Sequence, residues 1–229
     1  MTSRRRLMMA SQSVIKGSVN GIIQDDWKTI GKICAKGPDY VKKYYKVGDV
    51  KPIPIEGEGT IDYEIIGIGV QDKADGTGKA AISWFSKRLL SQETYYGMKP
   101  FSPFKGYEYS DLRSYLNDTL FTKLPADLQA IIVTVSNSDN TFSPTQNRVW
   151  TVGRADFISG GIFDSTLGTA DQRIRKKPSG DNRDWWLRDS PASNNQSGTI
   201  HVSTVTATGG VDNLSNINTQ RGVAFGFAT

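Results

Sequence analysis

The chain has 229 residues, of which 37% are apolar and 22% charged, with a formal net charge of +5 and a single cysteine. This length is ample for one large domain with a real core, and the composition excludes a disordered chain. One cysteine excludes an intramolecular disulfide and a cysteine-based zinc site.

Residues 1–20 are predicted to form a separate N-terminal arm, basic at Arg4, Arg5 and Arg6 and then polar. The apolar run after the arginines covers only residues 7–10, whereas a signal peptide needs about seven or more apolar residues. No segment approaches the ~20 apolar residues of a membrane span. We therefore expect a protein that has no signal peptide and does not insert into a membrane.

The first predicted element is a helix over residues 25–36, which begins with Asp25 or Asp26 as the N-cap and ends at Gly37. Its apolar residues fall at helical spacing: Trp27, Ile30, Ile33 and Cys34. A second short helix is predicted over residues 39–45. The small, apolar neighbours of Cys34 indicate a half-buried thiol rather than a catalytic nucleophile.

Strand signals follow. Residues 50–55 alternate around prolines, which predicts an edge strand. Residues 61–70 are β-branched and aromatic, and residues 80–86 form a partner strand. The Asp- and Gly-rich segment 71–79 between them predicts a hairpin with a long tip.

The middle of the chain alternates between short helices and short strands. Residues 110–117 predict a helix with Ser110 as its N-cap, and residues 124–130 predict another with Pro125 in the first turn. Strands are expected at residues 131–135 and 149–152.

Three strands are predicted near the C-terminus, at residues 184–188, 199–205 and 222–227. The segments between them, 190–198 and 209–219, are dense in Asn, Ser, Gly and Thr and are expected to be loops. No linker interrupts residues 21–229, so these residues are expected to form one α+β domain.

Enzyme signatures are scarce. Residues 75–79 partly match a phosphate-binding loop, but Lys73 and Ala80 stand where that motif needs Gly and Ser or Thr. His201 is the one histidine, and no motif gives it a catalytic or metal-binding partner. Acid–base chemistry on a sugar needs two carboxylates, and the nearest sequence cluster is Asp181, Asp184 and Asp189. Turns and ion pairs with Arg183 and Arg188 are the simpler explanation of that cluster.

The chain resembles a phage and prophage virion-protein family, the tail-fibre or adhesin-like proteins with a DUF6273-type domain. The resemblance runs over nearly the whole chain and rests on the following motifs: the Arg-Arg-Arg-Leu-Met-Met start, Tyr45-Lys-Val-Gly-Asp-Val50, Gly78-Lys-Ala-Ala-Ile-Ser-Trp-Phe-Ser86, Tyr109-Ser-Asp-Leu-Arg-Ser-Tyr-Leu116, Val149-Trp-Thr-Val152, Asp184-Trp-Trp-Leu-Arg188 and Arg221-Gly-Val-Ala-Phe-Gly-Phe227. The pairing of the last two motifs is the most specific part.

This resemblance implies a C-type-lectin-like fold, with a small twisted, mostly antiparallel sheet and short helices. It also implies recognition of a host-surface receptor by residues 189–220. The implied ligand-binding positions are Asp189, Ser190, Asn194, Asn195, Gln196, His201, Ser203, Asn213, Ser215, Asn216 and Asn218. The implied structural positions are Trp185, Trp186, Arg188, Phe225 and Phe227. No calcium motif of C-type lectins is present, so neither a metal nor a cofactor is expected.

The resemblance thus implies a non-enzymatic virion protein, made in the host cytoplasm, that binds a host-surface glycan or protein through Asn- and Ser-rich loops. The arm of residues 1–20 would contact other virion proteins, and the fibre-like role favours a homo-oligomer, with a trimer expected. Nucleic-acid binding is not expected, because the segment from Asp189 to the end carries few charges. Two alternatives remain: a purely structural head, baseplate or tail component, and a tail-associated polysaccharide-degrading enzyme.

Overall fold

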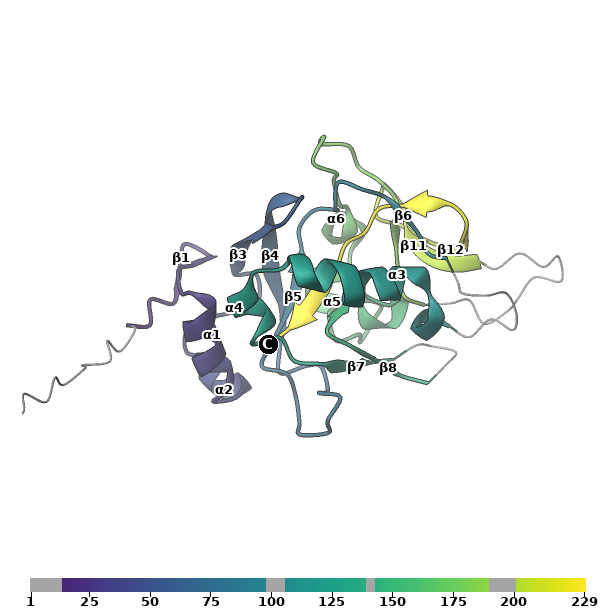
Figure 1. The fold of residues 1–229 in the computed structure, drawn as a ribbon. Helices are drawn as coiled ribbons and strands as arrows, with labels where there is room; N and C mark the ends of the chain where they lie inside the picture. The colour runs from purple at the N-terminus through teal and green to yellow at the C-terminus, as the bar shows by residue number, and fades with distance from the viewer. Residues whose placement is uncertain (1–13, 98–105, 139–142, 190–200) are drawn as a thin grey trace, which may run out of the picture.

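Residues 14–97, 106–138, 143–189 and 201–229 are described by the computed structural model of the protein, and they form a mixed α+β fold (Figure 1). The sheets are mostly antiparallel and the helices are short, as the sequence predicts. No helix in these ranges is long and apolar enough to span a membrane.

A seven-stranded sheet within the described residues organises the core. Its strands, in order across the sheet, are β1 (Ser18–Val19), β2 (Ile22–Ile23), β3 (Val50–Ile55), β4 (Gly59–Ile68), β5 (Ile82–Ser86), β14 (Gly226–Ala228) and β9 (Val149–Trp150). Only the β2–β3 pair is parallel. The sheet is larger than expected, because the N-terminal third of the chain supplies four of the seven strands. The first strand, Ser18–Val19, lies in the predicted arm.

The edge position predicted for residues 50–55 is wrong, because β3 lies between β2 and β4. The β2–β3 pairing is restricted to Ile22 and Val50. Pro52 and Pro54, which have no N–H to donate, therefore lie beyond the end of β2 and leave no ladder hydrogen bond unmade.

The predicted hairpin is confirmed: β4 and β5 pair antiparallel from Tyr63–Ser86 to Ile68–Ile82. All five residues of β5 are buried. Ile82 and Trp84 belong to one hydrophobic cluster and Phe85 to another, so apolar side chains cover both faces of the sheet at this strand.

Helix α1 (Trp27–Cys34) forms where the sequence predicts it, and Asp26 is its N-cap. The Asp26 carboxylate accepts a 2.7 Å hydrogen bond from the Thr29 backbone N–H, and its hydrogen bonds with Thr29 hold its pKa below the usual value. Helix α2 (Pro38–Val41) follows and is shorter than predicted.

Ser110 caps α3 (Asp111–Ser114) as predicted, and a π-helical segment, η2 (Tyr115–Leu120), continues it. Pro125 precedes α4 (Ala126–Gln129). The strand expected at residues 131–135 is displaced: β7 covers Val135–Asn137 and pairs with β8 (Thr145–Asn147). The remaining short helices are η1 (Tyr107–Tyr109), η3 (Phe121–Lys123), η4 (Arg154–Asp156), α5 (Asp164–Leu167) and α6 (Ala170–Arg173).

A three-stranded antiparallel sheet lies near the C-terminus and consists of β10 (Trp185–Trp186), β11 (His201–Val205) and β12 (Val211–Asn216). β13 (Gln220–Arg221) follows and pairs with β6 (Thr94–Tyr95). The predicted loop over residues 209–219 is therefore wrong in its central part. Asp, Asn and Ser have low strand propensity, but pairing with β11 overrides that local preference.

Aromatic side chains join the N-terminal and C-terminal parts of the chain. Trp27 of α1 packs edge-on against Trp84, with 5.4 Å between ring centroids, and Phe227 contacts both rings. On the other side of the sheet, Trp150 stacks on Phe163. Such pairs add roughly 0.5–1.5 kcal/mol each beyond the area they bury.

We expect Gly226→Ala to destabilise the fold by about 1–3 kcal/mol, because overpacked cores are strained. A Cβ atom at Gly226 would overlap the Trp84 carbonyl oxygen and lie 2.7 Å from the Trp150 ring. Urea unfolding measures the loss. Gly210→Ala is the control, since its added Cβ meets only the Thr206 hydroxyl, at 3.2 Å. Equal stability of the two variants would contradict this packing.

Candidate functional site

Arg188 ends the Trp-Trp-Leu-Arg motif and is 1% exposed. Its guanidinium forms a bidentate ion pair with Asp156, at 2.6 and 2.7 Å. It also donates to the carbonyl oxygens of Thr151, at 2.9 Å, and Ser138, at 2.8 Å. One side chain thus joins three stretches of the chain: its own, the one that contains Thr151 and Asp156, and the one that ends at Ser138.

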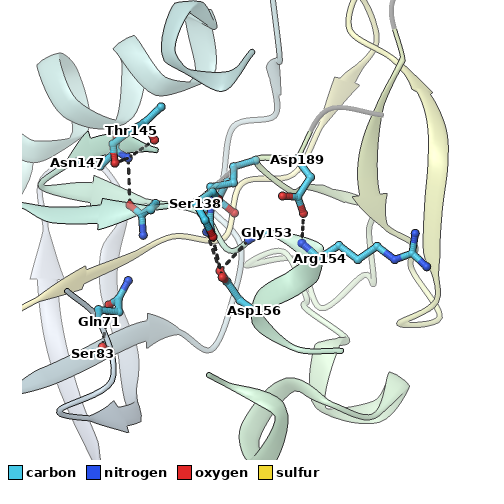
Figure 2. A network of polar contacts seen from close by, with 12 residues as sticks. Gln71, Ser83, Ser138, Thr145, Asn147, Gly153, Arg154, Asp156 and Asp189 are labelled. Atoms are coloured by element: carbon cyan, nitrogen blue, oxygen red, sulfur yellow. Dashed lines mark hydrogen bonds and ion pairs between the residues drawn. The ribbon is translucent and has the colours of Figure 1, made fainter. Parts of the chain in front are cut away.

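Asp156 is held for this pairing by the short helix η4. The Gly153 backbone N–H donates to Asp156 Oδ2 at 2.9 Å, and Figure 2 shows Gly153 beside this carboxylate. Asp156 is absent from the sequence prediction. A buried arginine requires a carboxylate partner, but sequence spacing alone does not indicate which one.

Opposing effects act on the pKa of Arg188. Burial alone lowers it, since it penalises the charged form, whereas the adjacent Asp156 carboxylate raises it. The ion pair prevails, and the pKa lies above the ordinary arginine value. Arg188 is therefore a permanent buried cation, neutralised by Asp156.

Asp189, a predicted ligand-binding residue, points inward and is 2% exposed. Its carboxylate accepts a hydrogen bond from the Arg154 backbone N–H (Figure 2), and its carbonyl oxygen accepts one from Ser203 N at 3.1 Å. Asp189 was predicted to contact a ligand, and the structure places its carboxylate inside the fold, against the start of η4.

Ser203 and Ser215 are also buried and offer no exposed surface. Ser203 donates to Asn213 Oδ1 at 3.1 Å, and the hydroxyls of Ser215 and Thr204 lie 2.8 Å apart. These contacts hold β11 against β12. Both serines were predicted to contact a ligand, and the structure places them inside the strand pair.

The remaining described candidates form what we call the amide surface: His201, Asn213, Asn216 and Asn218. His201 and Asn216 are direct partners in the β11–β12 register. Asn218 is exposed, and its backbone N–H donates to Asn216 Oδ1 at 2.8 Å. Ser190, Asn194, Asn195 and Gln196 lie outside the described residues.

An aromatic residue lies close to the amide surface and was missed by the sequence analysis. Tyr95 of β6 is 49% exposed and pairs in register with Gln220, which is also exposed. The Gly97 N–H donates to the Ile217 carbonyl oxygen at 3.3 Å, which ties this strand to the turn after β12. Figure 1 shows β6, β11 and β12 together at one end of the molecule.

The positions predicted to be structural are fully buried, namely Trp185, Trp186, Phe225 and Phe227. The indole N–H of Trp185 donates to the Arg173 carbonyl oxygen at 3.1 Å, and that of Trp186 to Thr94 O at 2.8 Å. Their polar atoms are thus satisfied inside the core. Trp186, Phe225 and Phe227 belong to one hydrophobic cluster and Trp185 to the other, so these rings fix the C-terminal strands in the core.

Asp181 and Asp184 of the acidic cluster are both engaged in local contacts. Asp184 accepts from the Ala207 N–H at 2.8 Å and lies 3.6 Å from Arg221, while Asp181 accepts from the Ser179 hydroxyl at 3.0 Å. The acidic cluster was expected to form ion pairs with Arg183 and Arg188, and this expectation is wrong, because both arginines have other partners. Arg183 lies 3.7 Å from Glu93, and Arg188 binds Asp156.

Cys34 is half-buried, as predicted, and its sulfur lies 3.4 Å from the Thr229 hydroxyl. Burial raises the pKa of the thiol to about 11, although the contact with Thr229 lowers it slightly. Among the described side chains, no group of three or more His, Cys, Asp or Glu could hold a metal ion.

A cavity of about 380 Å³ lies beside the Arg188–Asp156 pair. It is bounded by the tip of the β4–β5 hairpin, the end of β7 and the segment after η4. Its wall is mainly polar and includes two amide side chains, Gln71 and Asn137.

Replacing either member of the buried ion pair alone, as in Arg188→Met or Asp156→Leu, is expected to cost about 3–5 kcal/mol of folding free energy. The cost arises because the remaining charge stays buried without a partner. The double variant is expected to be more stable than the sum of the two single losses predicts. Urea unfolding of the four proteins measures this coupling.

Lys42→Met is the control for that cycle. It removes an exposed 3.0 Å ion pair with Asp39, which is expected to contribute less than about 1 kcal/mol. Strictly additive losses at Arg188 and Asp156 would contradict a coupled buried pair.

Alkylation of Cys34 by iodoacetamide is expected to be about a hundredfold slower in the folded protein than in the urea-unfolded chain at pH 8. The raised pKa leaves about a hundredfold less thiolate, and the thiolate is the nucleophile. Mass spectrometry follows the reaction. Equal rates in both states would show that burial does not suppress this thiol.

The comparisons with known proteins give one match. The family model described as "Domain of unknown function (DUF6273)" matches residues 86–227. No curated protein and no solved structure matches the chain. The matched span includes α3, the Arg188–Asp156 pair and the amide surface, and it begins after the first four strands of the large sheet. Because this span covers more than half of the chain, the protein belongs to the family described as Domain of unknown function (DUF6273).

Proposed function

We propose that the protein is a structural component of a phage or phage-like particle and binds a host-surface receptor, a glycan or a protein. The observation that carries the proposal is the amide surface, a group of Asn and His side chains on a sheet that buried aromatic rings and the Arg188–Asp156 pair hold in place.

The chemistry of this surface suits recognition without catalysis. A primary amide both donates and accepts hydrogen bonds, so it can pair with sugar hydroxyls or with a peptide backbone. Short Asn and Ser side chains lose little entropy when they are fixed, and antibody loops use them for the same reason. Tyr95 adds an exposed ring on which an apolar face of a ligand can pack.

We propose further that residues 21–229 have a C-type-lectin-like arrangement. Support comes from the mixed α+β class and from the C-terminal antiparallel strands β10 to β12, which present polar residues at one end of the molecule. In this arrangement, residues 190–200, which connect β10 to β11, belong to the same recognition region as the amide surface.

A binding role is favoured over the degradation of polysaccharide. The acidic residues that could form a catalytic pair are each engaged elsewhere: Asp184 with a backbone N–H and Arg221, and Asp189 with the Arg154 N–H. Fixed contacts of this kind hold turns in place, whereas glycoside hydrolysis needs two facing carboxylates about 5–10 Å apart.

In the particle, residues 1–20 would contact other virion proteins, and three copies would assemble into a fibre-like trimer. Several weak receptor sites on one particle then give strong overall attachment without a tight single site.

The test is attachment of the fluorescently labelled, multimerised chain to a panel of bacterial cells and to their isolated surface glycans. We expect saturable binding to a receptive strain, and an Asn216→Ala/Asn218→Ala variant should bind at least tenfold more weakly. Loss of two amide contacts of about 1 kcal/mol each gives a change of that size. Flow cytometry measures the bound fraction.

Gln24→Ala is the matched control, because Gln24 is an exposed amide near β2 and α1, in the N-terminal part of the molecule. It should leave attachment unchanged. Attachment by no strain would overturn receptor binding and favour a purely structural role in the particle. Release of reducing sugar from the glycans would instead favour the enzyme.

A further inference from the structure

The cavity beside Arg188 presents two buried amide groups on one wall. Gln71 and Asn137 are each 3% exposed, and both line it. The hydrogen bonds of the described residues engage the oxygen of each amide, Gln71 Oε1 and Asn137 Oδ1, and none of them uses Gln71 Nε2 or Asn137 Nδ2. Amide N–H groups that line a cavity in this way can donate to a partner that accepts hydrogen bonds.

A short antiparallel contact brings the segments of these two amides together. Lys73 forms an isolated antiparallel bridge with Val135, and Ser136 N donates to Asp72 O at 2.9 Å. Gln71 and Asn137 each lie two residues from this bridge, and both line the cavity.

The orientation of the Asn137 amide is fixed by a one-way chain of donors. Arg113, which can only donate, gives a 2.7 Å hydrogen bond to Asn147 Oδ1. Asn147 must then present Nδ2 on its other side, and it donates to Asn137 Oδ1 at 3.0 Å. The Nδ2 group of Asn137 is therefore the one left over for the cavity.

Gln71 is held by a contact with the neighbouring strand. Its Oε1 accepts a 2.7 Å hydrogen bond from the Ser83 hydroxyl of β5, and Figure 2 shows the two residues together. In this arrangement the Nε2 group is the end of the side chain that is left for the cavity. A hydroxyl can either donate or accept, so only the Asn137 amide has a direction that its neighbours force.

Charges on the cavity wall are already neutralised. Asp156 is paired with Arg188, and at the rim Asp72 lies 2.8 Å from Lys79. A charged ligand would find no unpaired counter-charge on these four residues. A volume of about 380 Å³ is near the lower end of the range for small-molecule sites, roughly 300–1,000 Å³.

We propose that this cavity binds a small uncharged polyhydroxylated ligand, a single hexose unit, whose hydroxyl oxygens accept hydrogen bonds from Gln71 Nε2 and Asn137 Nδ2. Arg113 is a positioning residue for this site, since it acts through Asn147. The site shares no residue with the amide surface and is independent of the receptor binding proposed above.

Saturation-transfer NMR on the full chain tests the proposal with glucose, galactose, mannose, N-acetylglucosamine and the charged sugar glucuronate. We expect at least one neutral sugar to bind saturably at millimolar concentration. Gln71→Glu and Asn137→Asp keep the acceptors used by Ser83 and Asn147 but remove the NH₂ groups. Each should weaken binding about tenfold, the effect expected for one lost donor.

Gln146→Glu is the matched control, because Gln146 lies exposed on β8 outside this cavity, and it should leave binding unchanged. Thermal unfolding shows whether the charged variants fold. If one of them does not, Gln71→Met replaces it in the test, because this change removes the donor without adding a charge. Binding of no neutral sugar, preference for glucuronate, or unchanged affinity of the cavity variants would overturn the proposal. The Asn216→Ala/Asn218→Ala variant should still bind the free sugar, so failure here is distinguishable from failure of cell attachment.

Discussion

The burial of the Arg188 charge is the constraint on which the C-terminal half of the molecule depends. A guanidinium at 1% exposure is tolerable only with a carboxylate in bidentate contact and with its other N–H groups engaged. Asp156, Thr151 and Ser138 meet these needs. Strand β9, helix η4 and the end of β7 are thereby fixed relative to β10.

The buried Arg188–Asp156 pair also holds the amide surface in place. Trp185 and Trp186 precede Arg188 and form the fully buried strand β10 of the three-stranded sheet, so the half-buried amides of β12 belong to a sheet with a fixed base. Asp189, the residue after Arg188, fixes η4 through the Arg154 N–H. Polar groups that are held in place before binding lose less entropy when a ligand arrives.

Polar side chains in the interior also orient one another through hydrogen bonds. One chain of hydrogen bonds runs from Arg113 of α3 to Asn147 of β8 and on to Asn137 of β7. Because Arg113 can only donate, each amide in this chain has one allowed orientation. Arg113 lies in the Ser-x-x-Arg-x-x-Leu helix and is part of the matched family span. Its contacts indicate a role in orientation rather than in direct recognition.

The sequence by itself determined the elements whose signals are local. Asp26 and Ser110 mark helix starts because their side chains satisfy nearby N–H groups, and the β-branched and aromatic residues of 61–70 mark a strand. Tertiary structure alone decided the pairing of Arg188 with Asp156, the placing of Gln71 and Asn137 on one cavity wall, and the strand formed by Asn- and Ser-rich residues 211–216. These features depend on contacts between residues distant in sequence, and no local propensity or spacing specifies such contacts.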